Sequence, residues 1–508
     1  MEENRITLEE NLKYLSMNKI QRFFYDFIHF FTHIPFALSR KMINFPFKFK
    51  SFVFSIGIVF RNIYIYFSRG DIFTRFSYIF MGLGLLKRKQ ILRGILYFVY
   101  EIFFIVYQSV FGIPSFIRLF SLGISDDNIY IKDNSFTIIL YFVFYVLLLV
   151  LFFYLWYNQI KESYKLEILS YLNLTLNDID LISRLKRNKF HTMLLSIPMT
   201  GLIFFTIVPS LIIIFLSFMD YDFLSSSNNL FTWIGGDNYA NALLSSTSGK
   251  GLTNIFARVF LWTLIFSFAS TLITYFFGMF IAIILQNKKL RFRNVFRNIL
   301  CISIAAPQFI IVLVLSVIFR SDDLGLLNGL FMKFGWIESP IDFLTSDQFY
   351  ALLPKLLILL VNAYLGIPYS MLIFSALVNR IPKEKYEIAS LEGVKTSKLC
   401  FKVTLPYLLY ITTPYFIFQF ISSFHAFNSI YLFSLGGPGF ADGSILSNNV
   451  GQTDTIFTWI YKLLTNSNFN YSLGFALGVL LFAFVFLFIL IFRKHINSLS
   501  QEGGRKHA

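Results

Sequence analysis

The sequence predicts an all-α, polytopic membrane protein, and composition, hydropathy and the length of the apolar runs each support this class. Of its 508 residues, 56% are hydrophobic and only 14% are charged. The mean hydropathy is +0.64, which is well above that of ordinary water-soluble domains. Many apolar runs reach about 20 residues, the length that a helix needs to cross the hydrocarbon core of a bilayer.

The net charge of +16 could indicate a nucleic-acid-binding protein. However, Lys and Arg form no single face or known binding motif, and they lie in patches between apolar runs, as the positive-inside rule predicts. Cys301 and Cys400 are too far apart in the sequence for a metal site, so we expect both to be isolated structural residues. The chain has no Gly-x-x-x-x-Gly-Lys-Ser/Thr phosphate loop and no pattern of catalytic residues, which argues against an ATPase or another enzyme.

Residues 1–94 interleave basic and aromatic residues, which favours helices that lie at the inner membrane surface. No cleavable signal is expected, because polar residues interrupt the first apolar stretch, Ile20–Leu38. The run Ser51–Phe67 leaves two alternatives open, an interfacial or re-entrant helix and a spanning helix. It contains Arg61, and an Arg at the centre of a span costs roughly 2.5–3.5 kcal/mol on insertion scales.

From Ile95 onward, the apolar runs predict eight membrane spans. They are residues 95–117, 136–157, 193–218, 256–285, 299–319, 355–378, 406–433 and 471–492. Pro198 and Pro209 lie within the third span, where we expect kinks.

The charges of the connecting segments predict the orientation of these spans. Residues 158–192, 286–298 and 379–402 are rich in Lys and Arg and are therefore expected to be cytoplasmic. The alternate segments carry fewer basic residues and contain many Asp residues, among them Asp322 and Asp454, and are expected to face outward. Eight spans with both termini in the cytoplasm satisfy every connecting segment.

The polar segment from Asn379 to Pro406 separates two long apolar runs. Pro382 suits the first turn of a helix, and Gly393 can adopt the left-handed conformation that ends one. We therefore expect a short helix, a glycine elbow and a second short segment that Pro406 stops.

This segment resembles the EAA loop of ABC importer permeases, the cytoplasmic coupling helix that docks into the ATPase subunit. The residues that carry the resemblance are Glu387, Ala389 and Gly393, followed by Thr404-Leu405-Pro406. An ordinary amphipathic turn between two spans is the alternative. The resemblance implies a coupling role for the residues of this loop: Lys383, Tyr386, Glu387, Ala389, Glu392 and Gly393.

Two further motifs resemble carbohydrate-type permeases of the same family. Leu435-Gly436-Gly437-Pro438 resembles the turn at the outer end of a core span, and Asn362 to Tyr369 resembles a stretch that lines the sugar site of maltose and maltodextrin permeases. The second resemblance implies that Asn362, Leu365, Gly366 and Tyr369 bind sugar.

The chemistry of three of these residues suits a sugar site. Asn362 can donate and accept hydrogen bonds, Tyr369 offers a ring with a hydroxyl, and Gly366 lets substrate approach the backbone. Their spacing places them on one helical face. The alternative is an Asn that joins two helices, with a small Gly at their crossing.

An ungapped alignment with the family implies further sugar contacts at Ser422 and Ser423. The family has Phe and Asn at these positions, so the Ser side chains keep hydrogen-bonding capacity and lose the ring. A packing or back-bonding role is the alternative, and His425 and Asn428 are polar alternatives nearby.

Motifs in the front half, such as Gly70-Asp71 and Met81-Gly82-Leu83-Gly84, resemble the N-terminal extension of Gram-positive maltodextrin permeases. The resemblance therefore covers about residues 70 to 495. Together with the composition, it predicts four regions: a basic cytoplasmic or interfacial region (1–94), two extra spans with a linker (95–192), the permease core (193–495) and a cytoplasmic tail (496–508).

The function implied by the resemblance is ATP-driven import of an oligosaccharide, with maltose or maltodextrin as the expected substrate. The expected partners are a second homologous permease, an ATPase dimer that binds ATP and Mg²⁺, an extracellular sugar-binding lipoprotein and membrane lipid. No cofactor, metal or nucleic acid is expected in this chain. Another sugar, such as a galacto-oligosaccharide, is the alternative substrate. A stand-alone secondary transporter is the alternative class, but the spans lack the charged relay that a proton-coupled carrier usually keeps.

Overall fold

The computed structural model describes residues 57–123, 133–172, 183, 190–221, 230–244, 252–286, 290–346, 351–381, 383–391, 396–439, 450–465 and 471–506. Internal contacts divide the chain into two compact units. The first unit comprises Met1–Phe116 and Tyr141–Ile203, and the second comprises Ile117–Leu140 and Phe204–Ala508.

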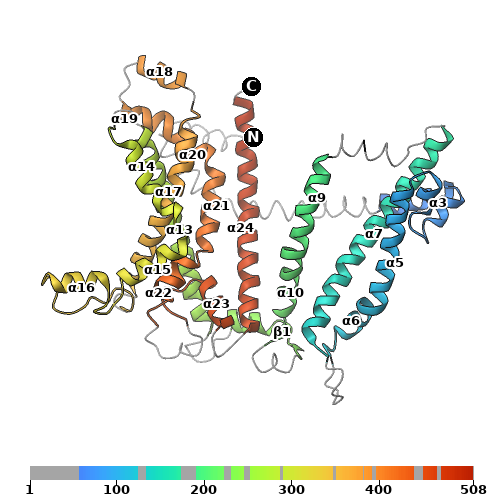
Figure 1. The fold of residues 1–508 in the computed structure, drawn as a ribbon, viewed down its shortest axis with the longest axis horizontal. Helices are drawn as coiled ribbons and strands as arrows, with labels where there is room; N and C mark the ends of the chain where they lie inside the picture. Colours follow the sequence, from blue (N-terminus) through green and yellow to red (C-terminus); the bar gives the residue numbers. More distant parts are fainter. Residues whose placement is uncertain are drawn as a thin grey trace, which may run out of the picture. The chain divides into compact units, whose positions relative to one another are not determined.

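The described residues are almost entirely helical, apart from one small antiparallel sheet in which β1 (Met219–Asp220) pairs with β2 (Thr232–Trp233). Within these described ranges, seven helices are long and apolar enough to cross a membrane, or eight if one bent pair counts as a single span. These helices confirm the predicted all-α polytopic fold (Figure 1).

The named helices before residue 203 are α3 (Ile72–Phe76), α4 (Leu83–Lys87), α5 (Ile91–Tyr107), the π-helical turn η1 (Gln108–Gly112), α6 (Ile113–Arg118), α7 (Ser135–Tyr171) and α9 (Phe190–Leu202). In Figure 1, α5 and α7 run side by side. The rings of Phe104 and Phe152 stack between them at 4.1 Å, and the Tyr100 hydroxyl donates to the Leu148 carbonyl at 3.3 Å. Residues 57–69 are also helical, while the start of the predicted 51–67 segment lies outside the described residues.

Arg88 joins α3, α4 and α7 at one end of the first unit. Its guanidinium donates to Asp71 Oδ1 at 2.8 Å, to Ser163 Oγ at 2.7 Å and to Glu167 Oε2 at 3.4 Å. Burial alone would raise the pKa of Asp71, but hydrogen bonds from Thr74 and the charge of Arg88 hold that pKa below its ordinary value. A side chain at Gly84 would collide with Ser163, so glycine lets α4 lie against α7.

The second unit holds most of the described helices, among them the long helices α13, α17 and α24. In chain order, the helices of this unit are α10 (Val208–Leu216), α12 (Asp237–Leu244), α13 (Leu252–Gln286), α14 (Arg293–Ala305), α15 (Gln308–Ile318), α16 (Leu326–Lys333), α17 (Leu352–Val378), α18 (Lys383–Leu391), α19 (Thr396–Leu399), η3 (Cys400–Thr404), α20 (Leu405–Ile411), α21 (Thr413–Phe424), α22 (Asn428–Ser434), α23 (Ile456–Thr465) and α24 (Tyr471–Lys506). The helix α13 packs along α17 and α21.

Glycines permit the close contact between α13 and α17. A side chain at Gly278 of α13 would collide with Ser370 of α17, and a Cβ at Gly366 of α17 would lie 2.6 Å from Thr274 Cγ2 of α13. Small residues at a crossing allow helix backbones to approach in a membrane, where lipid is as apolar as the side chains.

The predicted span 299–319 is not one straight helix, and the prediction is corrected here. It is divided between α14 and α15, which meet at an angle of 97°. Pro307 has no N–H to continue the helical hydrogen bonds, and Ala306 before it is extended, with φ −88° and ψ 143°. This is the conformation that proline imposes on the preceding residue.

The expected role of Pro406 is also corrected. It does not stop the second short segment, because the chain stays helical from α19 through the π-helical turn η3 into α20. Pro406 lies in the first two positions of α20, where a missing N–H costs little. In the third predicted span, a π-helical turn, η2 (Ile203–Ile207), separates α9, which contains Pro198, from α10, which begins beside Pro209.

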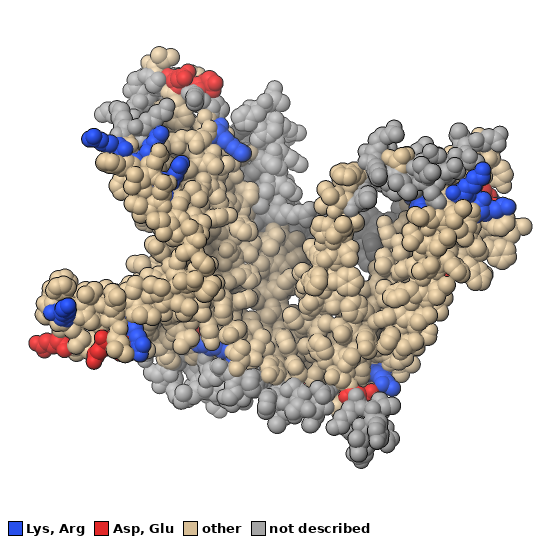
Figure 2. All heavy atoms as spheres, viewed as in Figure 1, with Lys and Arg blue, Asp and Glu red and all other residues tan. Residues whose placement is uncertain are grey.

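The described charges of the second unit lie mainly at its two ends. Figure 2 shows Lys, Arg, Asp and Glu near α18 and α14 at one end and near α16 at the other, with a mostly uncharged band between them. Such a band is expected of helices that cross a bilayer.

Candidate functional site

A polar seam, defined as Ser270, Thr271, Thr274, Asn362, Ser370, Tyr415, Gln419 and Ser423, runs along the contact of α13, α17 and α21. At one end of the seam, Asn362 Nδ2 donates to Ser270 Oγ. Ser423 Oγ lies 3.4 Å from Ser270 Oγ and accepts from Thr271 Oγ1 at 3.5 Å. These bonds join α17 and α21 to α13.

The other end of the seam continues through longer side chains. The hydroxyls of Ser370 and Tyr415 lie 2.7 Å apart, and Tyr415 donates to Gln419 Oε1 at 3.3 Å. Gln419 Nε2 then donates to Thr274 Oγ1 at 3.3 Å. The seam therefore satisfies polar groups of three helices within the protein, as buried groups at membrane depth require.

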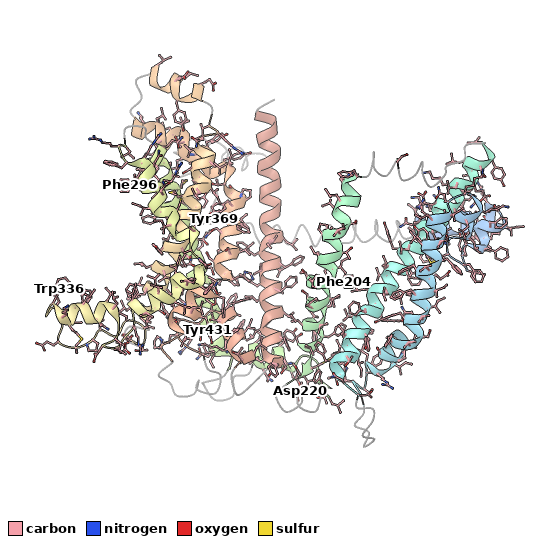
Figure 3. The ribbon with its side chains drawn as sticks, in the orientation of Figure 1. Phe204, Asp220, Phe296, Trp336, Tyr369 and Tyr431 are labelled. Atoms are coloured by element: carbon pink, nitrogen blue, oxygen red, sulfur yellow. The ribbon has the colours of Figure 1, made fainter. Side chains whose placement is uncertain are left out.

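The structure divides the predicted sugar residues into two groups. Asn362 and Ser423 are buried in the seam, and Gly366 faces Thr274 of α13. Leu365 packs against an apolar cluster. Tyr369, labelled in Figure 3, is 52% exposed, and Ser422 is also exposed.

The two exposed residues lie on different helices, Tyr369 on α17 and Ser422 on α21. Ser422 comes seven residues after Tyr415 on α21, so the two share a helical face. The Tyr415 hydroxyl contacts Ser370, the residue next to Tyr369. Tyr369 and Ser422 are accessible, whereas Asn362, Gly366 and Ser423 have the geometry of residues that join helices.

Sequence reasoning missed the hydroxyls of α13 that complete the seam. Thr263, Ser267 and Thr271 recur every four residues in an apolar run, and Ser270 and Thr274 repeat that spacing beside them. This periodicity marks one polar stripe on the helix. It could have identified the face of α13 that contacts α17 and α21.

A second polar centre fixes the turn after α22. Asp454 and Lys462 form an ion pair at 2.6 Å, with side-chain exposures of 0% and 11%. Asp454 also accepts from Gly451 N at 2.7 Å and from Thr458 Oγ1 at 2.9 Å. Burial raises the pKa of Asp454, and the positive charge of Lys462 opposes this shift.

The Gly-Gly-Pro turn packs directly on this ion pair. Gly436 has φ +78°, and a side chain there would collide with both Asp454 and Lys462. Thr453 Oγ1 donates to the Gly437 carbonyl at 2.7 Å. Sequence reasoning placed Asp454 in an outward-facing segment and did not predict its ion pair with Lys462. The spacing of Asp454, Thr458 and Lys462 at four-residue intervals was the signal that could have revealed the pair.

The predicted coupling segment contains a short helix, as expected. The helix α18 lies at the opposite end of the second unit from α22 and α23 (Figure 1). Its Tyr386 hydroxyl lies 2.9 Å from Thr404 Oγ1, and its ring packs on an apolar cluster of α13, α17 and α20. Glu387 is exposed. Glu392 and Gly393 lie outside the described residues, as do the side chains of Lys383 and Ala389.

Within the described ranges, no group of three or more His, Cys, Asp or Glu side chains could hold a metal ion. The site therefore consists of a polar seam, two exposed polar residues beside it, a fixed turn at one end and an exposed helix at the other.

Comparison with known families identifies this arrangement. Residues 274–499 match the family described as "Binding-protein-dependent transport system inner membrane component". This segment belongs to that family. The matched segment is thus that of an ABC permease, a multi-pass membrane component and not a catalytic subunit, and the family resemblance predicted from the sequence is confirmed.

Several relatives match most of the chain. The maltodextrin transport system permease protein MdxF of Bacillus subtilis is 26% identical over 428 residues, which cover 83% of this chain and 94% of that protein. MalC of Streptococcus pneumoniae, also a maltodextrin permease, is 26% identical over 77% of this chain and 88% of its own length. The galactooligosaccharides permease GanP of Bacillus subtilis is 28% identical over 77% and 90%.

Among solved structures, a bacterial ABC transporter involved in the import of the acidic polysaccharide alginate is similar to this chain. The sequence identity is 19% and the TM-score is 0.48, over 63% of this chain and 98% of that chain.

We predict that Asp454→Asn destabilises the protein by about 3–5 kcal/mol, because it leaves the Lys462 ammonium buried without its charged partner. The measurement is the thermal unfolding of the detergent-solubilised protein. The matched control is Arg320→Ala, which breaks an exposed pair with Asp322 and should cost about 0–1 kcal/mol. Equal melting temperatures for the two variants would contradict the structural role of the buried pair.

Proposed function

We propose that this chain is the permease subunit of an ATP-driven importer that carries an oligosaccharide of the maltodextrin class across the cell membrane. The observation that carries the proposal is the match to a maltodextrin permease over 94% of that protein's length. GanP matches at a similar identity, so galacto-oligosaccharides are the second candidate substrate.

The exposed face of α18 supports the proposed coupling to an ATPase. Glu384, Glu387, Ile388 and Leu391 are all exposed and follow helical spacing on one side. Two large apolar residues beside two carboxylates suit a helix that docks in a groove of a partner. The partner would be one subunit of an ATPase dimer that binds ATP and Mg²⁺, and the docking loop would comprise Lys383, Tyr386, Glu387, Ala389, Glu392 and Gly393.

The proposed sugar site lies beside the polar seam. Tyr369 and Ser422 are exposed and would contact the sugar directly, with the Tyr369 ring against a sugar face and both hydroxyls as hydrogen-bond partners. Asn362, Leu365, Gly366 and Ser423 would hold the helices that present them. All six residues that the sequence suggests for sugar binding therefore belong to the proposed site, two as direct contacts and four as supporting residues.

The remaining proposals concern topology and partners. Residues 193–495 would form the permease core and 95–192 the extra spans, while residues 1–94 and the 496–508 tail would lie on the cytoplasmic side with both termini. A second homologous permease would complete the pathway, and an extracellular sugar-binding lipoprotein would deliver substrate. The basic segment 286–298 and α18 would then share the cytoplasmic end.

The contacts of α18 suggest how nucleotide binding could reach the sugar site. Closure of the ATPase dimer would move α18, and the contact of Tyr386 with Thr404 would transmit this movement to the helix that leads into α21. Since α21 carries Ser422, Ser423 and Gln419, the movement would change the seam. For transport to be coupled, the sugar must bind one conformational state of the permease more tightly than the other. A ligand with equal affinity for both states does not change their populations.

The function is tested by reconstituting the complex in vesicles and measuring uptake of radiolabelled maltopentaose in a competition panel. We expect ATP-dependent uptake that excess unlabelled maltodextrin abolishes and a galacto-oligosaccharide does not. Competition by the galacto-oligosaccharide alone would favour the second substrate. ATP-independent uptake by the purified chain would support a stand-alone transporter instead.

We predict that Gly393→Asp abolishes ATP-driven uptake while the chain still inserts in the membrane, because a charged side chain at the elbow would disturb docking of the coupling helix. Uptake and membrane content are measured on the same vesicles. The control is Gly236→Asp, which alters a glycine with open space around it just before α12. Normal uptake by the Gly393 variant would count against the coupling role.

We also predict that Tyr369→Ala lowers sugar uptake roughly tenfold without loss of assembly, because the ring and hydroxyl would no longer contact substrate. The matched control is Tyr364→Ala, a similarly exposed tyrosine on another face of α17. Co-purification of the subunits reports assembly. Unchanged uptake kinetics in the Tyr369 variant would remove this residue from the site.

A further inference from the structure

A cluster of aromatic side chains lies where α22 meets α23. The α22–α23 aromatic patch consists of His425, Phe427, Tyr431, Phe457 and Tyr461. The rings of Phe427 and Tyr431 stack at 5.0 Å, and each lies 4.8 Å from the ring of Tyr461. His425 and Phe457 extend the patch, with their rings 5.7 Å apart.

The patch is accessible on the surface of the second unit. Phe457 is 37% exposed and Tyr461 is 38% exposed, and His425 is also exposed. Figure 3 labels Tyr431, which lies closer to the α22–α23 turn than Tyr369 does. His425, Phe427 and Tyr431 lie along the chain between Ser422 and the Gly-Gly-Pro turn.

The buried ion pair holds the two halves of the patch in place. Lys462 follows Tyr461 directly on α23, and its partner Asp454 packs on Gly436, which lies just beyond the end of α22. Ser434 at the end of α22 also contacts Thr453 through hydroxyls 3.1 Å apart. The rings are thus pre-positioned, so a ligand would bind them with little loss of conformational entropy.

The chemistry of the patch fits a sugar better than a lipid chain. The exposed surface of α5 is typical of contact with lipid, because it presents aliphatic and Phe side chains such as Ile102, Phe103 and Val106. The patch instead combines ring faces with the hydroxyls of two tyrosines and an imidazole. A sugar offers both matching surfaces, C–H faces for the rings and hydroxyls for the polar edges.

We propose that the α22–α23 aromatic patch is a second sugar-binding site, which stacks on sugar units of oligosaccharides that extend beyond Tyr369 and Ser422. This inference rests on the proposed function, and it adds a determinant of chain-length preference. A disaccharide held at Tyr369 would gain little from the patch, whereas a longer chain could contact both sites at once.

The test compares uptake of maltose and maltopentaose by the complete reconstituted transporter. In the double variant Tyr431→Ala with Tyr461→Ala, we expect the ratio of maltopentaose to maltose uptake to fall roughly threefold to tenfold, a range that individual aromatic contacts can supply. The same binding protein delivers both sugars to every variant, so its preference cancels when variant and wild type are compared. The double variant Tyr431→Phe with Tyr461→Phe keeps the rings and should recover most of the ratio.

The control is Phe482→Ala, which removes an exposed ring of α24 that stacks on Phe486 and should leave the ratio unchanged. An unchanged ratio in the double Ala variant, or an equal fall for both sugars, would overturn the second site. Loss of the second permease during purification of that variant would overturn it as well, and would make the patch a subunit interface. If the wild-type transporter imports neither sugar, the proposed function itself fails. This outcome is distinct from failure of the second site, because every other outcome requires that the wild-type transporter imports both sugars.

Discussion

The close contact between α13 and α17 is the interaction on which the second unit depends. Lipid tails are as apolar as the side chains of these helices, so burial of apolar surface gives little reason for them to associate in a bilayer. Two other contributions are visible. Gly278 and Gly366 remove the side chains that would keep the helices apart, and Asn362 donates to Ser270 across the contact. Close backbones and satisfied polar groups therefore replace the hydrophobic effect that would hold a soluble core together.

The same seam explains how a transport pathway could change shape without unfolding. Its groups are mostly hydroxyls and amides, which both donate and accept hydrogen bonds and can exchange partners over short distances. At 3.3–3.5 Å, the bonds around Ser423, Thr274 and Gln419 are long compared with typical protein hydrogen bonds. A shift of α21 against α13 would exchange weak bonds for similar ones. A seam built from ion pairs would resist that shift, because separating buried charges is costly.

Much of this architecture could be predicted from sequence, because membrane spans and charged loops follow strong physical rules. Seven of the eight predicted spans, the short helix after Pro382 and the family were predicted correctly, since length, charge and local motifs determine them. The 97° bend at Pro307 was not predicted, because hydropathy shows only that the segment is apolar and does not report a change in the direction of the helix. The buried role of Lys462 was missed for a different reason. Asp454 in the loop and Lys462 in the helix form an ion pair only in the folded turn, and hydropathy carries no information about that contact.

The two ends of the second unit differ in a way that suits an importer driven from one side. At the turn after α22, a buried ion pair, a glycine with φ +78° in close contact with that pair, and hydrogen bonds between side chains and the backbone fix the chain. At the opposite end, α18 is held through Tyr386 and leaves Ile388 and Leu391 exposed. A rigid end can present a surface of constant shape to an arriving ligand. An exposed helix can follow a moving partner. Under the proposed coupling, a partner would move α18, and the fixed turn would hold one end of α22 in place. Movement of α21 would then change the seam without displacing the whole bundle.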